Sequence, residues 1–305
     1  MFSGESISMC DSNTNPSLRF IRESVGIRLA LLFSAFFILL SVTSLISLLI
    51  DNFWITSERN EGLFGAVLQC ILAFIVPSVI LARFCSAHPF RWLKCEKFFR
   101  VLPFIGVVVV YLLSLPAMEW LISWNSNLHF PDFLRDIEMT FRSWEENNAA
   151  ISQMLLATDS IGGVITGILI IGILTGFSEE LFFRGSLQGI FQRSSLGPDK
   201  SVWLAAIIFS ALHFQFFGFF PRLIMGAFFG YLFIWTKSLW VPVFAHSLNN
   251  SVVVVISSQT ENLNANEGTF FPPVIESIPY LLPVMSFLLT SLFLLFLRNY
   301  FFKKN

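Results

Sequence analysis

The sequence is poor in charge. Only 13% of its 305 residues are Asp, Glu, Lys or Arg, and 55% are hydrophobic. Soluble domains carry roughly a quarter charged residues, so this composition excludes an ordinary soluble fold. The formal net charge is −1. The chain therefore also lacks the basic face that nucleic-acid binding requires.

Cysteine is scarce as well. The four cysteines, Cys10, Cys70, Cys85 and Cys95, show no paired spacing. This pattern excludes a disulfide framework and a zinc-finger type of site. No cleavable signal is evident, because residues 1–20 are polar and the first apolar run is long enough to stay in the membrane.

Long apolar runs dominate the rest of the chain. A transmembrane helix needs about 20 such residues. The predicted spans are Leu29–Ile50, Leu63–Ala82, Val101–Met118 with a possible extension to Trp124, Ile161–Ser178, Val202–Phe220, Leu223–Thr236, Ser238–Ser258 and Ile278–Leu297. The short sixth run forms a predicted hairpin with the fifth, turning at Pro221-Arg222. The sequence thus predicts an all-α, polytopic transmembrane bundle of about eight spans.

The basic residues are concentrated in every second segment between these spans. If the amino terminus is cytoplasmic, the inside segments hold 15 of the 19 basic residues. These are Arg19, Arg22, Arg28, Arg83, Arg91, Lys94, Lys97, Arg100, Arg184, Arg193, Lys200, Lys237, Arg298, Lys303 and Lys304. The outside segments keep Arg59, Arg135, Arg142 and Arg222. The positive-inside rule therefore predicts that both termini are cytoplasmic, with a tail over residues 1–28 and a single transmembrane domain over 29–305.

The connection over residues 125–160 is acidic and is predicted to lie outside. Phe133, Ile137, Phe141 and Trp144 recur within it at steps of three and four. This spacing predicts an amphipathic helix on the membrane surface, acting either as a packing cap or as a substrate lid. Glycine pairs four residues apart, such as Gly172 and Gly176, predict closely packed helices.

Ionisable groups inside the apolar runs are the most informative residues, since each costs about 2.5–3.5 kcal/mol to insert at the centre of a span. Glu179, Glu180 and Arg184 end the fourth run. Glu180 and Arg184 share a helix face and are expected to pair. Glu179 lies about 100° away and lacks that partner, so burial would make it a stronger base. A cluster of charges where the helix leaves the membrane is the alternative interpretation.

Two histidines lie in later runs. His213 follows Phe209 by one turn, and it is predicted to lie about 18 Å into the fifth span. His246 and Asn250 are four residues apart in the seventh and share a face, whereas the adjacent Asn249 is expected to point elsewhere. Each histidine alone could be a hydrogen-bonded packing residue.

Taken together, these groups suit hydrolysis of an amide. A carboxylate and an imidazole can hold and deprotonate a water, and a second imidazole with an amide can stabilise an oxyanion. All lie in the cytoplasmic half or near the midplane of the predicted bundle. The expected catalytic core therefore covers about residues 161–258.

At these residues the sequence resembles the CPBP family, the CAAX-protease and bacteriocin-processing ("Abi") intramembrane endopeptidases. The shared motifs are Glu-Glu-x-x-x-Arg at 179–184, Phe-x-x-x-His at 209–213 and His-x-x-x-Asn at 246–250. Their order and spacing match the family pattern, and the likeness extends from about residue 176 to 251. The first 150 residues share only the hydrophobic profile.

The resemblance implies a role for each matched residue. Glu179 and His213 would activate the hydrolytic water, and His246 and Asn250 would form the oxyanion site. Glu180 and Arg184 would orient the motif helix, and Phe209 is expected to be an orienting or structural residue. The resemblance also implies an endopeptidase of the CAAX type. Together with the predicted spans, we expect it to act near the cytoplasmic side of a bacterial cytoplasmic membrane. Its partners would be a membrane-associated protein or peptide substrate and the lipid bilayer.

Three alternatives remain at this point. Members of the family have been described as metalloproteases and as glutamate proteases. We favour metal-free catalysis, because Glu-x-x-x-Arg forms an ion pair and His-Glu-x-x-His is absent, although Glu179, His213 and His246 could form a zinc set. A proton-coupled transporter could use the same side chains as a relay. A catalytically idle immunity or scaffold protein is the third possibility.

Overall fold

The computed structural model describes residues 24–50, 57–96, 101–158, 160–260 and 280–304. Within these ranges the chain forms helices and turns and contains no strand. The first helices are α2 (Val25–Ile50), α3 (Glu58–Leu68), the π-helix η2 (Gln69–Ile75), α4 (Val76–Cys85), α5 (Pro89–Trp92), α6 (Leu102–Ser126), the 3₁₀-helix η3 (Asp132–Leu134) and α7 (Arg135–Leu156). The predicted tail over residues 1–28 lies mostly outside the described residues.

The second half of the chain begins with one long, continuous helix. It consists of α8 (Ile161–Gly167), the π-helix η4 (Ile168–Leu174), α9 (Thr175–Glu180), the π-helix η5 (Leu181–Gln188) and α10 (Gly189–Gln192). The remaining elements are α11 (Pro198–Ala211), the 3₁₀-helix η6 (Phe216–Gly218), α12 (Phe219–Thr236), α13 (Trp240–Thr260) and α14 (Leu281–Lys304).

Seven helices in the described ranges are long and apolar enough to cross a membrane. They are Val25–Leu49, Glu58–Cys85, Leu102–Ser126, Ile161–Gln192, Phe216–Thr236, Trp240–Gln259 and Leu281–Phe301. The protein is therefore an integral, multi-pass membrane protein with a helical bundle, as the composition predicted.

The predicted fifth span, Val202–Phe220, differs from the structure. Helix α11 has only 14 residues, which corresponds to about 21 Å, or roughly two thirds of the hydrocarbon core. It ends at Ala211, where the chain turns, and Phe214 adopts a positive φ of 53°. The apolar residues after this turn begin η6 and α12 instead of extending α11.

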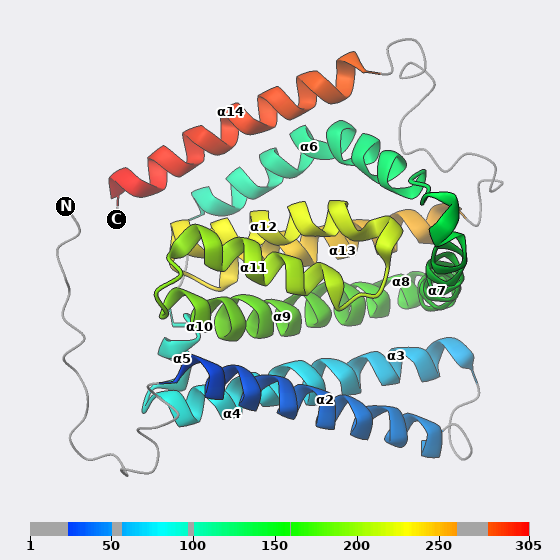
Figure 1. Ribbon diagram of the computed structural model, residues 1–305, viewed down its shortest axis with the longest axis horizontal. Helices are drawn as coiled ribbons and strands as arrows, with labels where there is room; N and C mark the ends of the chain where they lie inside the picture. The colour runs from blue at the N-terminus through cyan, green and yellow to red at the C-terminus, as the bar shows by residue number, and fades with distance from the viewer. Residues whose placement is uncertain (1–23, 51–56, 97–100, 159, 261–279, 305) are drawn as a thin grey trace.

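The helices run back and forth along one direction (Figure 1). Helix α2 begins and α14 ends at one end of the bundle, and α7 lies at the opposite end (Figure 1). We call these the terminal end and the α7 end. In Figure 1, α2, α3 and α4 form one flank, α6 and α14 form the other, and α8 to α13 lie between them.

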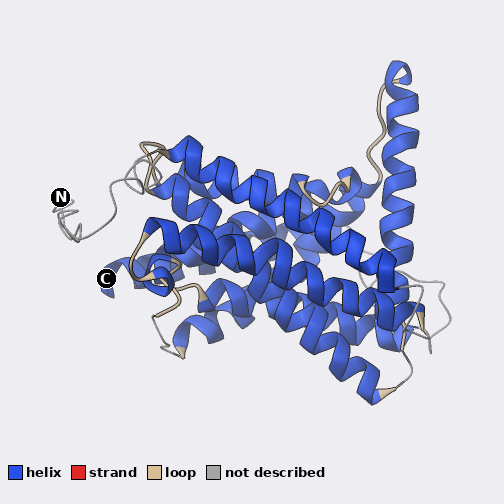
Figure 2. Ribbon diagram, turned by 90° about the horizontal axis from the view of Figure 1, so that it is seen from below, coloured by secondary structure: helices blue, strands red, loops and turns tan. Residues whose placement is uncertain are grey.

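Helix α7 runs at right angles to the transmembrane helices. It is seen end-on in Figure 1 and along its length in Figure 2. The prediction of a helix parallel to the membrane surface is thus supported in both existence and direction. Its aromatic face is divided: the Phe141 ring stacks on Phe216 with centroids 5.7 Å apart, whereas Phe133, in η3, is 82% exposed.

Small residues bring α13 close to the helix of the first motif. A Cβ atom added at Gly176 would lie 2.6 Å from Ser247 Oγ and 3.0 Å from the Ser247 backbone nitrogen. A side chain of any size would therefore force α9 and α13 apart. This close approach places His246, on α13, opposite the two glutamates that follow Gly176.

Candidate active site

The first motif forms a buried ion pair. Arg184 Nη1 lies 2.6 Å from Glu180 Oε1, and the two side chains are 1% and 0% exposed. Arg184 Nη2 also donates a hydrogen bond of 2.9 Å to the carbonyl oxygen of Gly226 on α12. The predicted pairing of Glu180 with Arg184 is confirmed. It joins the continuous helix Ile161–Gln192, which we call the motif helix, to α12.

Glu180 has a second partner that the sequence did not indicate. His246 Nδ1 lies 2.7 Å from the same Oε1 atom of Glu180. A carboxylate in an ion pair can only accept hydrogen bonds, so Nδ1 of His246 carries the proton. The other ring nitrogen, Nε2, then faces Glu179, whose Oε2 atom lies 3.8 Å away.

His213 lies in the turn after α11 and not inside a span. Its Nδ1 atom is 2.8 Å from the carbonyl oxygen of Phe209. Because a carbonyl can only accept, Nδ1 of His213 is protonated, and its Nε2 atom keeps a free lone pair in the neutral ring. That tautomer can accept a proton or a hydrogen bond from a water molecule.

Phe209 connects the two histidines. Its ring makes edge contacts with His213 and His246, with centroids 4.9 Å and 5.9 Å away. The guanidinium of Arg184 also lies 4.8 Å from the centre of the Phe209 ring. Phe209 is therefore a buried ring that contacts three side chains of the motifs.

Asn250 is anchored by its neighbours. Its amide nitrogen donates a hydrogen bond of 3.2 Å to the carbonyl oxygen of Ile171, and its side-chain oxygen accepts one of 3.3 Å from Asn249. Asn249 also lines the cavity described below. The expectation that Asn249 points elsewhere is wrong, because the helical path of α13 brings both amides to the cavity wall.

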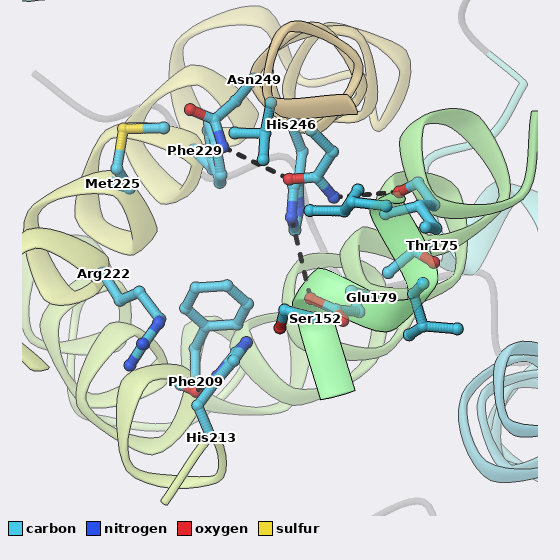
Figure 3. A pocket seen from close by; sticks show the side chains of 15 residues that line it. Ser152, Thr175, Glu179, Phe209, His213, Arg222, Met225, Phe229, His246 and Asn249 are labelled. Carbon is cyan, nitrogen blue, oxygen red and sulfur yellow. Dashed lines mark hydrogen bonds and ion pairs between the residues drawn. The ribbon is translucent and has the colours of Figure 1, made fainter. Parts of the chain in front are cut away.

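These side chains share one cavity of about 420 Å³. Glu179, His213, His246 and Asn250 all line it. Figure 3 shows the labelled Glu179, His213 and His246 side chains pointing toward the same space from three different elements. Glu179 is only 13% exposed. The structure therefore brings together the four residues that the motifs singled out, whereas the roles assigned to them remain predictions.

Other lining residues were not identified from the sequence. Phe229 of α12 stacks on the His246 ring with centroids 4.9 Å apart. Arg222 lines the cavity as well and bonds to Gln215 through its two terminal nitrogens. From the sequence, Arg222 is predicted only to lie in a hairpin turn. An arginine in the first turn of an apolar helix opposes the helix dipole, and this is the signal that marks its position as unusual.

A zinc site would need three or more ligating side chains close together. Among the residues that the structure describes, no group of three or more His, Cys, Asp or Glu side chains is placed to hold one metal ion. The set Glu179, His213 and His246 is thus not assembled as a zinc site here, and no step below uses a metal.

The cavity extends from the motif residues to helix α7. Ser152, Leu155 and Leu156 of α7 line the cavity together with the motif residues. Helix α7 belongs to the connection that we predicted to lie outside. The cavity therefore extends from the motif residues toward the end opposite the termini, whereas the cytoplasmic termini and the position of the site near the cytoplasmic side stay predictions.

A buried cluster of acid, imidazole and amide groups in a polytopic bundle marks a functional site of a membrane protein. Comparison with known proteins indicates the class of peptidases. Residues 161–252 match the family model "Type II CAAX prenyl endopeptidase Rce1-like". The resemblance of this segment to the CPBP and CAAX protease family is thereby confirmed.

A curated relative extends the similarity without adding an activity. The chain is 28% identical over 149 residues to "Uncharacterized protein YpbD" of Bacillus subtilis (strain 168). The matched region covers 48% of this chain and 61% of the relative. No solved structure matches the chain significantly.

Proposed function

We propose that this protein is an intramembrane endopeptidase that hydrolyses a peptide bond of a membrane-associated protein or peptide. The observation that carries the proposal is the convergence of Glu179, His213, His246 and Asn250 on one cavity within the bundle. The match of residues 161–252 to an endopeptidase family supports the same reaction class.

The geometry supports a water held between Glu179 and His213. Both groups offer acceptors to the cavity: the Glu179 carboxylate, and the Nε2 atom of His213 that its bond to Phe209 leaves free. A water that donates one hydrogen to each acceptor would turn a lone pair toward a bound carbonyl carbon. We assign Glu179 as the general base that takes the water proton and later delivers it to the leaving amine.

The oxyanion would be stabilised by α13. The Asn250 amide uses one N–H on Ile171 and keeps a second for a substrate oxygen. His246 can donate from Nε2 when that nitrogen carries a proton, while Glu180 holds its other nitrogen. Donors fixed in advance in a water-poor cavity are worth several kcal/mol to a developing negative charge, about 2.7–4 kcal/mol for one donor.

The family match favours a protease over the carrier that the sequence left open. Every residue from Leu181 to Phe191 is buried, so the motif helix closes the site toward the terminal end. A carrier in one of its two states would be closed on one side in the same way, whereas the match of residues 161–252 is to an endopeptidase family.

The test is a comparison of membrane proteomes from cells that produce the wild type, Glu179→Gln or Glu146→Gln. Glu146 is an exposed glutamate on α7 and provides a matched control for loss of a carboxylate. We expect uncleaved precursors to accumulate only with Glu179→Gln. Equal precursor levels in all three strains, or unchanged cleavage of a verified substrate by purified Glu179→Gln, would contradict the proposal.

A further inference from the structure

The cavity has a defined bottom and a defined mouth. Along α12, the lining residues run from Arg222 in the first turn to Phe229, which is 1% exposed. Along α13, they run in the opposite chain direction, from Val253, which is 45% exposed, down to His246, which is 5% exposed. Along both helices, the residues that line the cavity therefore change from buried to more exposed toward the α7 end.

The motif helix shows the same gradient. Ile171 and Thr175 line the cavity nearer the α7 end, and Glu179 follows deeper along the helix. Beyond Glu179, Glu180 is 0% exposed and pairs with Arg184. The buried stretch from Leu181 to Phe191 then occupies the path to the terminal end. Among the described residues, the cavity is therefore closed by the motif helix toward the terminal end and extends toward the α7 end.

Helix α7 itself forms part of the mouth. Ser152, Leu155 and Leu156, in its last turn, line the cavity. Arg59 of α3 fixes this turn, donating hydrogen bonds of 3.0 Å to the Leu155 carbonyl and 2.9 Å to the Gly163 carbonyl. A helix that lies across the bundle end (Figure 2) and is held in place by a basic residue thus borders the entrance.

Charge indicates which side of the membrane this end faces. Among the described residues, the segments at the terminal end (Figure 1) hold Arg28, Arg83, Arg91, Lys94, Arg193, Lys200, Lys237 and Arg298. Arg184 is left out of this set, because it is buried in an ion pair. The connection that contains α7 is acidic and holds Arg135 and Arg142 as its basic residues. Cytoplasmic segments carry the excess of Lys and Arg, so the α7 end is the extracytoplasmic one.

We propose that the active-site cavity opens to the extracytoplasmic face of the membrane. This inference rests on the proposed peptidase function and specifies its substrate class. The substrate is an exported, membrane-anchored protein or peptide whose cleaved segment lies at the outer boundary of the bilayer. The soluble product is released outside the cytoplasm.

Single cysteines in a cysteine-free protein provide the test, with all native cysteines replaced by serine. Ser152→Cys reports on the cavity mouth, Ser143→Cys on the exposed side of α7, and Lys200→Cys on the start of α11 at the terminal end. Intact spheroplasts are treated with a membrane-impermeant maleimide before and after permeabilisation. We expect Ser143→Cys and Ser152→Cys to be labelled in intact spheroplasts, and Lys200→Cys only after permeabilisation.

Labelling of Lys200→Cys but not Ser143→Cys in intact spheroplasts would overturn the orientation. Labelling of Ser152→Cys only after permeabilisation, while Ser143→Cys reacts from outside, would overturn the assignment of the mouth. Neither readout requires catalysis, so a wrong topology is distinguished from a wrong activity. A failure of Glu179→Gln to change the proteome, with the expected labelling, would instead overturn the peptidase function alone.

Discussion

His246 Nδ1 and Glu180 lie 2.7 Å apart, although 66 residues separate them in the chain. The same Glu180 oxygen accepts a hydrogen bond from Arg184. One buried carboxylate therefore fixes both the ion pair that joins α12 to the motif helix and the tautomer of the second histidine. Glu180 acts through these partners and is a positioning residue, whereas Glu179 faces the cavity.

The first prediction concerns this buried pair. Arg184→Ala should lower the free energy of unfolding by about 3–5 kcal/mol, because it leaves the carboxylate of Glu180 buried without its cation. Thermal unfolding of the purified protein in detergent measures the effect. Arg135→Ala, at the exposed start of α7, removes the same charge as a control and should change the midpoint little.

Restoring charge balance gives a sharper form of this test. The double variant Glu180→Ala with Arg184→Ala should be less destabilised than the sum of the two single variants, because neither charge is then stranded. Additive losses in the double-mutant cycle would show that the pair does not interact in the membrane protein.

A second prediction concerns the close approach of α9 and α13. Gly176→Ala should destabilise the protein and reduce cleavage, since its Cβ would meet the backbone of Ser247 and push His246 away from Glu179. Gly162→Ala is the matched control, because nothing lies within 4 Å of a Cβ atom at that position. The thermal midpoint and the cleavage rate of both variants provide the measurement. Equal values for Gly176→Ala and Gly162→Ala would contradict the packing argument.

A third prediction concerns Asn249, which sequence reasoning had set aside. Asn249→Ala removes a hydrogen bond to Asn250, worth about 0.5–1.5 kcal/mol. We expect kcat to fall by up to about tenfold, with little change in the thermal midpoint. Asn250→Ala should have a larger effect on kcat. If Asn249→Ala reduces activity only as far as it reduces folded protein, its role is purely structural.

A fourth prediction concerns the pH dependence of the contacts that Glu138 makes in the first turn of α7. The backbone N–H of Phe130 and the guanidinium of Arg142 lower the pKa of Glu138 to about 2. A depressed pKa contributes stability that is complete above the ordinary value of 4.5 and is lost as the pH falls toward 2. The contacts of α7 should therefore persist at pH 5.

Hydrogen exchange of residues 128–145 between pH 3 and 7 provides the measurement, after correction for intrinsic exchange rates. Glu138→Gln should increase the exchange of these amides at every pH. Glu146→Gln, at an exposed position of the same helix, should leave it unchanged. An opening transition near pH 5 in the wild type would show that Glu138 is not held in its charged form.

A fifth prediction concerns metal dependence. We expect cleavage to survive exhaustive chelation, because the proposed base and oxyanion groups belong to the chain. The assay compares dialysed protein with and without chelator, followed by addition of zinc. Loss of activity that zinc restores would instead support ligation by Glu179, His213 and His246 after rearrangement.

Sequence reasoning was strongest where local spacing determines geometry. Glu180 and Arg184 are four residues apart on one helix, and they form the predicted pair at 2.6 Å. Reasoning failed at α11, where an apolar run appeared to continue as one span to Phe220. The helix ends at Ala211, because apolar composition shows that a segment is buried in lipid or protein but does not show where its backbone turns.

The contacts that define the site could not be predicted from the spacing of residues along the sequence. The bond between Glu180 and His246 and the approach of α7 to the cavity join segments that are distant in the chain. They depend on how the helices cross, and hydrophobic periodicity constrains only the face that each helix buries.

The amino-acid sequence by itself determined that the chain is a membrane-spanning helical bundle and which polar groups are set into it, because burying charge in lipid is costly at any position. The tertiary structure decided that these groups share one cavity and that this cavity opens beside α7. That direction follows from the packing of Leu181–Phe191 against its neighbours, which closes the opposite end.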